Sequence, residues 1–541
     1  MDFTEFTEYA SEIEPESRDK VITRKLSDLL EETDEDLAIV ARFIQGRIFP
    51  AWSDRKIDVG PSLLYESLKI ASGTSPAEIK ELVKQEGDPG AAAASLDLSG
   101  QMTLGSSKLT LGYVYGKLKS IADSEGEGSQ EKKVRTLADL FMKCGGEDAK
   151  YLARLVLGEM RVGVGEGTVR DALVQTYRVD KSEVERGLMV TNDVGKVASV
   201  ARDQGTDGLE KLEIELGRPV KPMLAQAAEI GGVTEEWPGE ASIEYKFDGA
   251  RLQIHAMEDG IQLYSRNLEE LTNSLPDVVE ILKDDLGERD VILDAEVVAI
   301  EDGDPLPFQE VLKRLRRKYR IDEMSSEIEM VVRVFDIIYR DGELISHPLR
   351  ERYRHLDEVL DETDTDHWLT DDVERVREIE REALSLGQEG LMAKNPDSNY
   401  SPGKRGRDWL KIKPEPETLD VVVLGGEWGE GRRADFIGSY LLGVKGKEGY
   451  EPIGRVATGL TDEDLMELTE RFEPLIETES EGILEFQPRV VFEVGYDEIQ
   501  ESPQYGSGYA LRFPRFLEIR EDLEVDDTDT VEKVERLANR G

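Results

Sequence analysis

Hydrophobic residues recur three and four positions apart through most of residues 1–215. Clear examples are the stretches 21–33 (VITRKLSDLLEET) and 147–160 (EDAKYLARLVLGEM). This spacing puts the apolar side chains on one face of an α-helix, where they can be buried together. The pattern predicts an N-terminal region built mainly of amphipathic helices.

Between residues 241 and 413 short runs rich in β-branched residues alternate with helical stretches, which is typical of a domain built around sheets. The runs expected to be strands are 241–247, 260–265, 290–300, 330–339, 390–394 and 409–413. We therefore expect an α/β or α+β domain in this part of the chain.

The C-terminal segment contains further strand-like runs at 420–431, 438–446, 450–459 and 489–499, separated by glycine turns, and a final helix after an acidic stretch. A few short strands can remove their open edges by closing into a small β-barrel. Proline-containing junctions at 217–226 and 413–420 separate the three regions. We expect domains at 1–216, 217–414 and 415–541.

The charge of the chain is strongly negative. It has 68 Lys and Arg against 116 Asp and Glu, a net charge of −48. Disorder is one interpretation of such acidity, but apolar periodicity persists from end to end and 39% of the residues are hydrophobic. A folded protein whose surface is adapted to concentrated salt fits better, because excess carboxylates keep it soluble where ions screen other charges.

Cysteine usage and apolar runs exclude several classes of protein. Cys144 is the single cysteine, which excludes disulfides and a four-cysteine zinc site within the chain. The N-terminal stretch MDFTEFTEYASEIE is acidic and does not look like a signal peptide. No apolar run approaches the ~20 residues of a membrane span. We expect a soluble, cytoplasmic protein with no membrane partner.

Charged residues interrupt several of the predicted strands. Residues two apart in a strand share a face, so Lys246 with Asp248, and Asp294 with Glu296, should each point the same way. Other members of the set are Arg266, Phe335, Glu389, Lys394, Lys411 and Lys413. Cations can hold a triphosphate, carboxylates a divalent metal, and an aromatic ring can stack on a base. A lysine whose pKa is lowered by neighbouring cations and burial could attack phosphorus as a free amine.

Six stretches, in order, resemble the motifs of the covalent nucleotidyltransferases. They are EYKFDGAR (244–251), YSRN (264–267), LDAEVVA (293–299), VFDIIY (334–339), EGLMAK (389–394) and WLKIK (409–413). Three more stretches resemble ATP-dependent DNA ligases: GEMRVGVGEGTVRDAL (158–173), VGYDEIQESPQY (494–505) and LRFPRFLEIRED (511–522). Nearly the whole chain is covered by these stretches, and it is most similar to an archaeal ATP-dependent DNA ligase, related to the eukaryotic replicative ligase, in a halophilic version.

This resemblance implies a fold and an activity. The expected fold is multidomain: an all-α DNA-binding domain, an α+β nucleotidyltransferase (adenylation) domain and a C-terminal OB-fold β-barrel. The expected activity is sealing of nicks in duplex DNA through lysyl-AMP and DNA-adenylate, with ATP and Mg²⁺, by a monomer acting in replication, repair and recombination.

The resemblance also assigns roles to individual residues. Lys246 would take AMP, Glu244 would contact the adenine, and Phe335 would stack on it. Glu296 would bind ribose or metal, and Glu389 would serve the metal. Phosphates would be held by Arg251, Arg266, Arg405 and Lys411. Gly249 would let the chain turn away from the nucleophile.

Several features leave two interpretations open. Asp294 could hold metal or be structural, and Asp248 could only orient its strand. The basic stretch 312–320 could contact phosphates or be a solvated helix face. Arg161 and Arg170 flank glycines that could let amides approach DNA phosphates or be plain turns. The stretch near Gln101, with Met102 and Leu104, lies where related ligases bind a sliding clamp, but lacks their aromatic pair and could be a linker.

One departure from the family lies near the C-terminus. Relatives typically read R-x-D-K where this chain has Arg520, Glu521, Asp522 and then Leu523. The missing lysine leaves Arg520, with Arg512 or Arg515, to orient the leaving pyrophosphate.

Other functions fit the sequence less well. RNA ligases and capping guanylyltransferases share the central motifs but usually lack a long helical DNA-binding region. NAD-dependent ligases usually carry a four-cysteine zinc module, which a single cysteine cannot supply. A non-catalytic nick-binding scaffold would be expected to have lost Lys246 or a phosphate-binding cation.

Overall fold

The computed structural model describes residues 1–98, 109–126, 128–237, 239–301, 303–315, 328–360, 365–414, 417–429, 436–447, 449–480 and 482–538. The chain forms two compact units, Met1–Ile412 and Lys413–Gly541. In the described ranges no helix is both long and apolar enough to cross a membrane.

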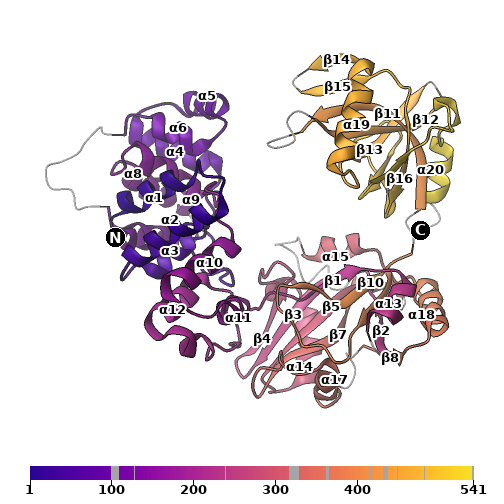
Figure 1. Ribbon diagram of the computed structural model, residues 1–541, viewed down its shortest axis with the longest axis horizontal. Coiled ribbons are helices and arrows are strands. Elements are labelled where there is room, and N and C mark those ends of the chain that lie inside the picture. Colours follow the sequence, from indigo (N-terminus) through magenta and orange to yellow (C-terminus); the bar gives the residue numbers. More distant parts are fainter. Residues whose placement is uncertain are drawn as a thin grey trace. The chain divides into compact units, whose positions relative to one another are not determined.

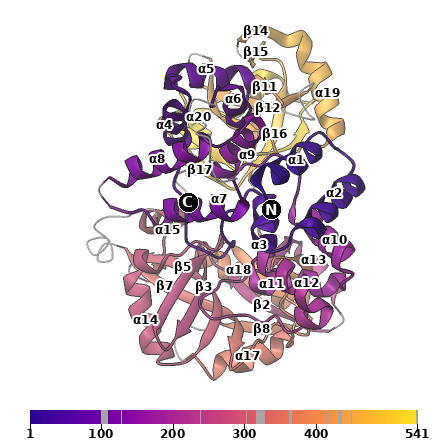
Figure 2. The same ribbon diagram turned by 90° about the vertical axis from the view of Figure 1, so that its left-hand side faces the viewer.

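The N-terminal region is helical, as the apolar spacing predicts (Figure 2). Its helices are α1 (Phe3–Ile13), α2 (Asp19–Glu32), α3 (Leu37–Phe43), α4 (Pro61–Ser72), α5 (Pro76–Glu86), α6 (Pro89–Ser95), α7 (Leu111–Ala122), α8 (Ser129–Phe141), α9 (Gly146–Val156), α10 (Glu166–Tyr177), α11 (Lys181–Thr191) and α12 (Val194–Leu209). Local sequence fixes several helix starts. Ser75 and Asp88 each accept a hydrogen bond from a first-turn amide, and each is followed by proline at the first helical position.

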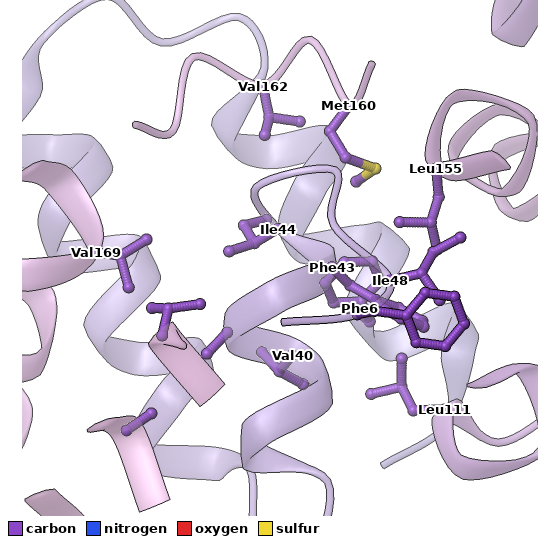
Figure 3. Packing of buried hydrophobic residues seen from close by; sticks show 14 of the residues in the cluster. Phe6, Val40, Phe43, Ile44, Ile48, Leu111, Leu155, Met160, Val162 and Val169 are labelled. Carbon is purple, nitrogen blue, oxygen red and sulfur yellow. The ribbon is translucent and has the colours of Figure 1, made fainter. Parts of the chain in front are cut away.

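The helices share one apolar core. Figure 3 shows Phe6 of α1, Phe43 of α3, Leu111 of α7 and Leu155 of α9 converging in it. The Phe6 and Phe43 rings meet edge to face with centroids 6.2 Å apart. The same cluster includes Met223, beyond the last helix, so the chain is already packed where it enters the sheets.

Two sheets follow (Figure 1). The first has the strand order β1 (Leu224–Ala227), β10 (Arg405–Ile412), β9 (Gly390–Lys394), β2 (Ala241–Lys246) and β8 (His367–Thr370). Only its β1–β10 pair is parallel. Its apolar face, which includes Ile243, Leu391 and Leu410, is covered by α13 (Ile230–Glu236) and α18 (Val373–Ser385).

The second sheet has the order β4 (Gly260–Ser265), β3 (Ala250–Met257), β5 (Val291–Glu301) and β7 (Glu329–Arg340), with the short β6 (Asp304–Pro305) paired to the end of β5. Its apolar face packs against α14 (Pro276–Leu286), α15 (Phe308–Leu315) and α17 (Leu349–Asp357). Each sheet therefore keeps one face free of its covering helices, and the charged strand residues occupy those faces.

The second unit is an OB-fold domain. Its strands are β11 (Glu417–Trp428), β12 (Ile437–Lys445), β13 (Tyr450–Val456), β14 (Ile476–Ser480), β15 (Ile483–Phe486), β16 (Val491–Tyr496) and β19 (Arg515–Ile519), with a hairpin of β17 (Glu498–Glu501) and β18 (Tyr509–Arg512). The long β11 pairs with β12 on one side and with both β15 and β16 on the other. Gly425 permits this, because a Cβ there would lie 2.4 Å from the Leu484 carbonyl oxygen. The helices are α19 (Asp462–Phe472) and α20 (Val531–Ala538).

The predicted fold class is confirmed: an all-α region, an α+β region and a C-terminal OB-fold. The six strands expected between residues 241 and 413 are present, two of them (260–265 and 390–394) with the expected bounds and the other four with shifted ends. One boundary matters for the chemistry. β2 ends at Lys246, so the strand argument that placed Asp248 on the same face as Lys246 is wrong.

Candidate active site

The first sheet presents a row of polar side chains on the face opposite its apolar core. In the register, Lys394 lies between Ser242 and Trp409, and Met392 lies between Glu244 and Lys411. Lys246 pairs with Gly390. Directly opposite residues of antiparallel strands point to the same side, and positions two apart share that side. Glu244, Lys246, Lys394 and Lys411 therefore share one face.

Lys246 lies at the end of β2, next to Glu389. Its Nζ donates a hydrogen bond to Glu389 Oε2, and the Glu389 amide donates to the Lys246 carbonyl oxygen at 2.9 Å. The Lys246 side chain is 22% exposed and that of Glu389 26%. A lysine held by a carboxylate at an accessible strand end can meet a phosphorus atom from solvent.

The chain crosses from the first sheet to the second directly after Lys246. A Cβ on Gly249 would lie 2.4 Å from the Val297 carbonyl oxygen and 2.9 Å from Glu296 Cγ. Gly249 is thus required by the close approach of β5. Asp248 Oδ2 accepts a hydrogen bond from the Phe308 amide at 3.2 Å, which anchors the start of α15.

The second sheet supplies Arg251 and Glu296, which lie directly opposite each other on β3 and β5. The Arg251 guanidinium is bound by both oxygens of Asp294, and its Nε lies 2.8 Å from Oδ1. Tyr400 donates to Asp294 Oδ2 at 2.7 Å. Although burial opposes the charge, Asp294 holds the pKa of Arg251 above its usual value. Asp294 is fully buried and occupied by these partners, which favours the structural interpretation of this residue.

Glu296 lies within the electrostatic reach of Lys246 and Glu389. Burial raises the pKa of Glu296 to about 7, although Lys246 and Arg251 pull it down. Holding a negative charge on Glu296 costs free energy, because its carboxylate is buried. A cation or a phosphate group that binds nearby would therefore change its protonation.

Glu244 lies in a buried cage beside the stacking candidate Phe335. Lys394 Nζ lies 2.7 Å from each Glu244 carboxylate oxygen, and Tyr353 Oη donates to Oε1 at 2.5 Å. Lys394 Nζ also donates to the Phe335 carbonyl oxygen at 3.1 Å. The Phe335 ring meets Trp409 edge to face, with centroids 6.0 Å apart. The structure thus brings the two predicted adenine contacts to one lysine.

The remaining predicted phosphate-binding cations are spread over the strands. Arg266 directly follows Ser265, which pairs with the residue after Arg251, and its side chain is exposed. Lys411 is half-buried on the face of Lys246. Arg405 is exposed at the first residue of β10, six positions from Lys411. Arg405 therefore lies at the other end of its strand from the Lys246 cluster.

Whether the carboxylates near Lys246 can hold Mg²⁺ depends on how many of them lie together. Among the described residues no group of three or more His, Cys, Asp or Glu side chains is arranged to hold a metal. Glu296 and Glu389 beside Lys246 provide two oxygen ligands of the kind that Mg²⁺ prefers. Because Mg²⁺ is usually held by one or two carboxylates with water and substrate phosphates, this pair fits that ion without a complete protein cage.

The basic residues predicted to meet DNA have protein partners in the free chain. Arg161 Nη2 donates to Glu159 at 2.8 Å, and Arg170 donates to Asp171 and Glu185 at 2.8 and 2.9 Å. In the basic stretch 312–320, Arg314 is buried and bound to Asp277 at 2.6 Å, so phosphate contact is wrong for that residue.

Two predicted features lie outside the described residues. They are the clamp-binding stretch with Gln101, Met102 and Leu104, and positions 316–320 of the basic stretch.

Sequence reasoning missed several buried residues near the site. Asp336, the residue after Phe335, forms a fully buried ion pair with Arg352, in which Arg352 Nε lies 2.7 Å from Asp336 Oδ1. An aspartate inside the apolar run VFDIIY was a usable signal for this pair, since a buried charge needs a partner. Tyr353 and Tyr400 gave no comparable signal.

Comparisons with known proteins match three separate parts of the chain to domains of DNA ligases. Residues 2–174 match the DNA ligase N terminus, 222–413 the ATP dependent DNA ligase domain, and 433–523 the ATP dependent DNA ligase C terminal region. A DNA ligase of Haloarcula marismortui is 48% identical, over 99% of this chain and 100% of the relative. A DNA ligase of Archaeoglobus fulgidus is 45% identical, over 99% of this chain and 98% of the relative.

A likeness of fold extends to solved structures. A chain described as Pmar-Lig_PreS3 matches with a TM-score of 0.53 at 18% identity, covering 95% of this chain and 99% of its own. Together, the family matches and the full-length relatives show that the protein belongs to the family of ATP-dependent DNA ligases.

Proposed function

We propose that the protein seals nicks in duplex DNA by transferring AMP from ATP to Lys246, then to the 5′-phosphate of the nick, in replication, repair and recombination. The observation that carries this proposal is the position of Lys246. It is a partly exposed lysine at a strand end, bound to Glu389, and its charge acts on Glu296, which lies opposite Arg251 in the second sheet.

The first step forms a bond between Lys246 Nζ and the α-phosphorus of ATP, and the bond from that phosphorus to the bridging oxygen breaks. Pyrophosphate leaves with the electron pair. The attacking amine must be neutral, so Nζ has to lose its proton before the bond to phosphorus forms. Glu389 orients Nζ through their hydrogen bond.

The other site residues have positioning and binding roles. Glu244 contacts the adenine and Phe335 stacks on it. Arg251, Arg266, Arg405 and Lys411 bind the phosphates of the nucleotide and later of the nick. Support comes from the shared face of Glu244, Lys246 and Lys411, and from the position of Arg251 opposite Glu296.

The second and third steps transfer and then release AMP. The 5′-phosphate oxygen of the nick attacks the phosphorus of lysyl-AMP, the N–P bond breaks, and DNA-adenylate forms. The 3′-hydroxyl then attacks the 5′-phosphorus, the phosphodiester bond forms, and AMP leaves.

Mg²⁺ is the expected metal, with Glu296 and Glu389 as its protein ligands. When bound it would neutralise phosphate charge in the transition state. The two carboxylates beside Lys246 support this assignment, since phosphates and water complete such sites.

We further place domain boundaries at 216/217 and 414/415, next to the proline-containing junctions. The division of the chain between Ile412 and Lys413 supports the second boundary. The protein would act as a monomer in the cytoplasm, where its DNA substrate lies, with a weak clamp site near Gln101.

The proposal is tested with the full-length protein in concentrated KCl. Labelled ATP should give a stable protein–AMP adduct that converts to sealed DNA when a nicked duplex is added. Label from GTP but not ATP would favour a capping guanylyltransferase, and binding of nicked DNA without any adduct would favour a scaffold. Either result overturns the proposed function.

A further inference from the structure

Lys394 occupies a position that the nucleotidyl-transfer chemistry does not use. Its side chain is 1% exposed, and its Nζ is shared between the Glu244 carboxylate and the Phe335 carbonyl oxygen. The same Nζ lies 4.6 Å from the ring centroids of Phe335 and Trp409. One ammonium group therefore binds a carboxylate, a backbone carbonyl and two aromatic faces at once.

Tyr353 is a second partner of the Glu244 carboxylate and comes from a helix that covers the second sheet. It lies on α17, donates to Glu244 Oε1 at 2.5 Å, and lies 2.9 Å from Ser242 Oγ. Its ring stacks on His367 at a centroid distance of 4.0 Å, which fixes the direction of the hydroxyl. Burial raises the pKa of Tyr353 well above its usual value, so the hydroxyl remains a donor at working pH.

These partners decide what Glu244 can offer to a base. Lys394 and Tyr353 both donate to the Glu244 carboxylate, which acts as the acceptor toward both, and an ionised carboxylate can only accept hydrogen bonds. Lys394 and Tyr353 each donate a hydrogen bond to Oε1, and Lys394 Nζ also lies 2.7 Å from Oε2, so the lone pairs left for a ligand lie on Oε2. An acceptor at that position suits the 6-amino group of adenine and repels the 6-oxo group of guanine or hypoxanthine.

We infer that Lys394 and Tyr353 are positioning residues that set base specificity, by holding Glu244 in place as a hydrogen-bond acceptor for the 6-amino group. This inference rests on the proposed adenine contact of Glu244. Lys394 also links that contact to the stacking ring, because it donates a second hydrogen bond to the carbonyl oxygen of Phe335. Edge recognition and stacking are thereby held in one geometry.

The test compares ATP with ITP, which carries a 6-oxo group and lacks the 2-amino group of GTP. Single-turnover formation of the protein–nucleotide adduct is measured with full-length protein, and the ratio of kcat/KM for ATP to that for ITP is the readout. Lys394→Met should lower this ratio by about 10-fold or more, because the site then loses its acceptor-only character. Tyr353→Phe should lower it by a smaller factor of about 3.

Two controls separate positioning from general damage. Arg352→Met removes another fully buried cation of the same region, one that pairs with Asp336 and not with Glu244. It should reduce stability without changing the ratio. Glu244→Gln should relax the ratio as far as Lys394→Met does, and the double variant should show no further change, because Lys394 acts through Glu244.

Equal losses with ATP and ITP in both Lys394→Met and Tyr353→Phe would overturn the inference and leave the ligase function standing. If Lys394→Met does not fold, the ratio in Tyr353→Phe and Glu244→Gln decides. Absence of any adduct in the wild-type protein would instead overturn the proposed function, and the inference with it.

Discussion

Lys246 and Glu389 contact each other twice: through their side chains, and through the Glu389 amide, which donates to the Lys246 carbonyl oxygen at 2.9 Å. The residue after Glu389 pairs with Lys246 in the β2–β9 ladder. The carboxylate is therefore fixed beside the amine by the backbone of the sheet, and substrate binding is not needed to assemble the pair.

Lys246→Ala should abolish attachment of labelled AMP while leaving the fold intact. The side chain is partly exposed, and a single exposed ion pair contributes about 1 kcal/mol or less to stability. The variant should still seal a pre-adenylated nick at a reduced rate, because that step needs no lysyl-AMP. Gel detection of the adduct and of the sealed strand measures the two steps separately. Retained labelling would remove Lys246 from its assigned role.

Gly249→Ala should disturb the geometry of the site, although Gly249 takes no part in the reaction. The added Cβ would meet the Val297 carbonyl oxygen at 2.4 Å, and backbone cannot move away as a flexible side chain can. Such overpacking costs about 1–3 kcal/mol. A displacement of about 1 Å between β2 and β5 would slow adenylylation by about 100-fold. Chemical denaturation and adduct kinetics are the measurements.

Gly231→Ala in α13 is the matched control for that change, because its Cβ would have no neighbour within 4 Å. It should keep or raise stability and leave adduct formation unchanged. If Gly249→Ala behaves like Gly231→Ala, the close approach of β5 is not a constraint on this position.

Much of this architecture could be predicted from residue patterns, for stated physical reasons. Period-3.6 and period-2 spacing gave the helical region and the strands, and six ordered motifs located Lys246, Arg251 and Glu296. Strand alternation correctly grouped Asp294 with Glu296, because both lie within β5 and pair with alternate residues of β3. It failed for Asp248, because β2 ends at Lys246 and the alternation stops there.

The partners of buried charges could not be predicted in the same way. Lys394 and Tyr353 lie 150 and 109 residues from Glu244 in sequence, and no local pattern encodes contacts at such separations. Arg314 shows the opposite error. Its place in a basic stretch favoured DNA contact, whereas the fold buries it against Asp277.

Arg520→Ala should slow self-adenylylation by about 100-fold, since a cation matched to a developing charge is worth several kcal/mol in a closed site. Pyrophosphate leaves only in the first step, so sealing of pre-adenylated DNA should barely change. In the free chain Arg520 Nη1 donates to Asp420 at 2.8 Å and Nη2 to Asp522 at 2.7 Å. Single-turnover kinetics of the separate steps is the measurement.

Two further variants test the same arginine. Asp420→Asn removes one competitor for the guanidinium and should leave self-adenylylation unchanged or faster, as should Leu523→Lys, which restores the cation found in relatives. Equal losses in both steps for Arg520→Ala would show that this arginine supports the OB-fold through Asp420 and Glu493.

Folding and sealing should both require KCl or NaCl on the order of molar, because a charge of −48 repels both itself and DNA until salt screens it. Ordinary DNA binding weakens steeply with salt, so a sealing activity that increases with salt concentration is the distinctive result. Circular dichroism and nick sealing across a salt series measure it. Full structure and maximal activity at about 0.1 M salt would contradict the salt-adapted surface.

His255 should make stability depend on pH. It is fully buried; its Nδ1 accepts from the Gly217 amide at 3.0 Å and its Nε2 donates to Gln253 Oε1 at 3.0 Å. Burial lowers the pKa of His255 to about 3, whereas the unfolded chain binds this proton near 6.5. Stability is therefore fully present above pH 6.5 and falls toward pH 3, by at most about 1.4 kcal/mol per pH unit.

His255→Asn keeps an acceptor for Gly217 but does not titrate, so it should be less stable at pH 7 and show a flatter slope of stability against pH. Urea unfolding in concentrated KCl at several pH values compares the two proteins, and parallel curves would exclude His255 as the group that binds the proton.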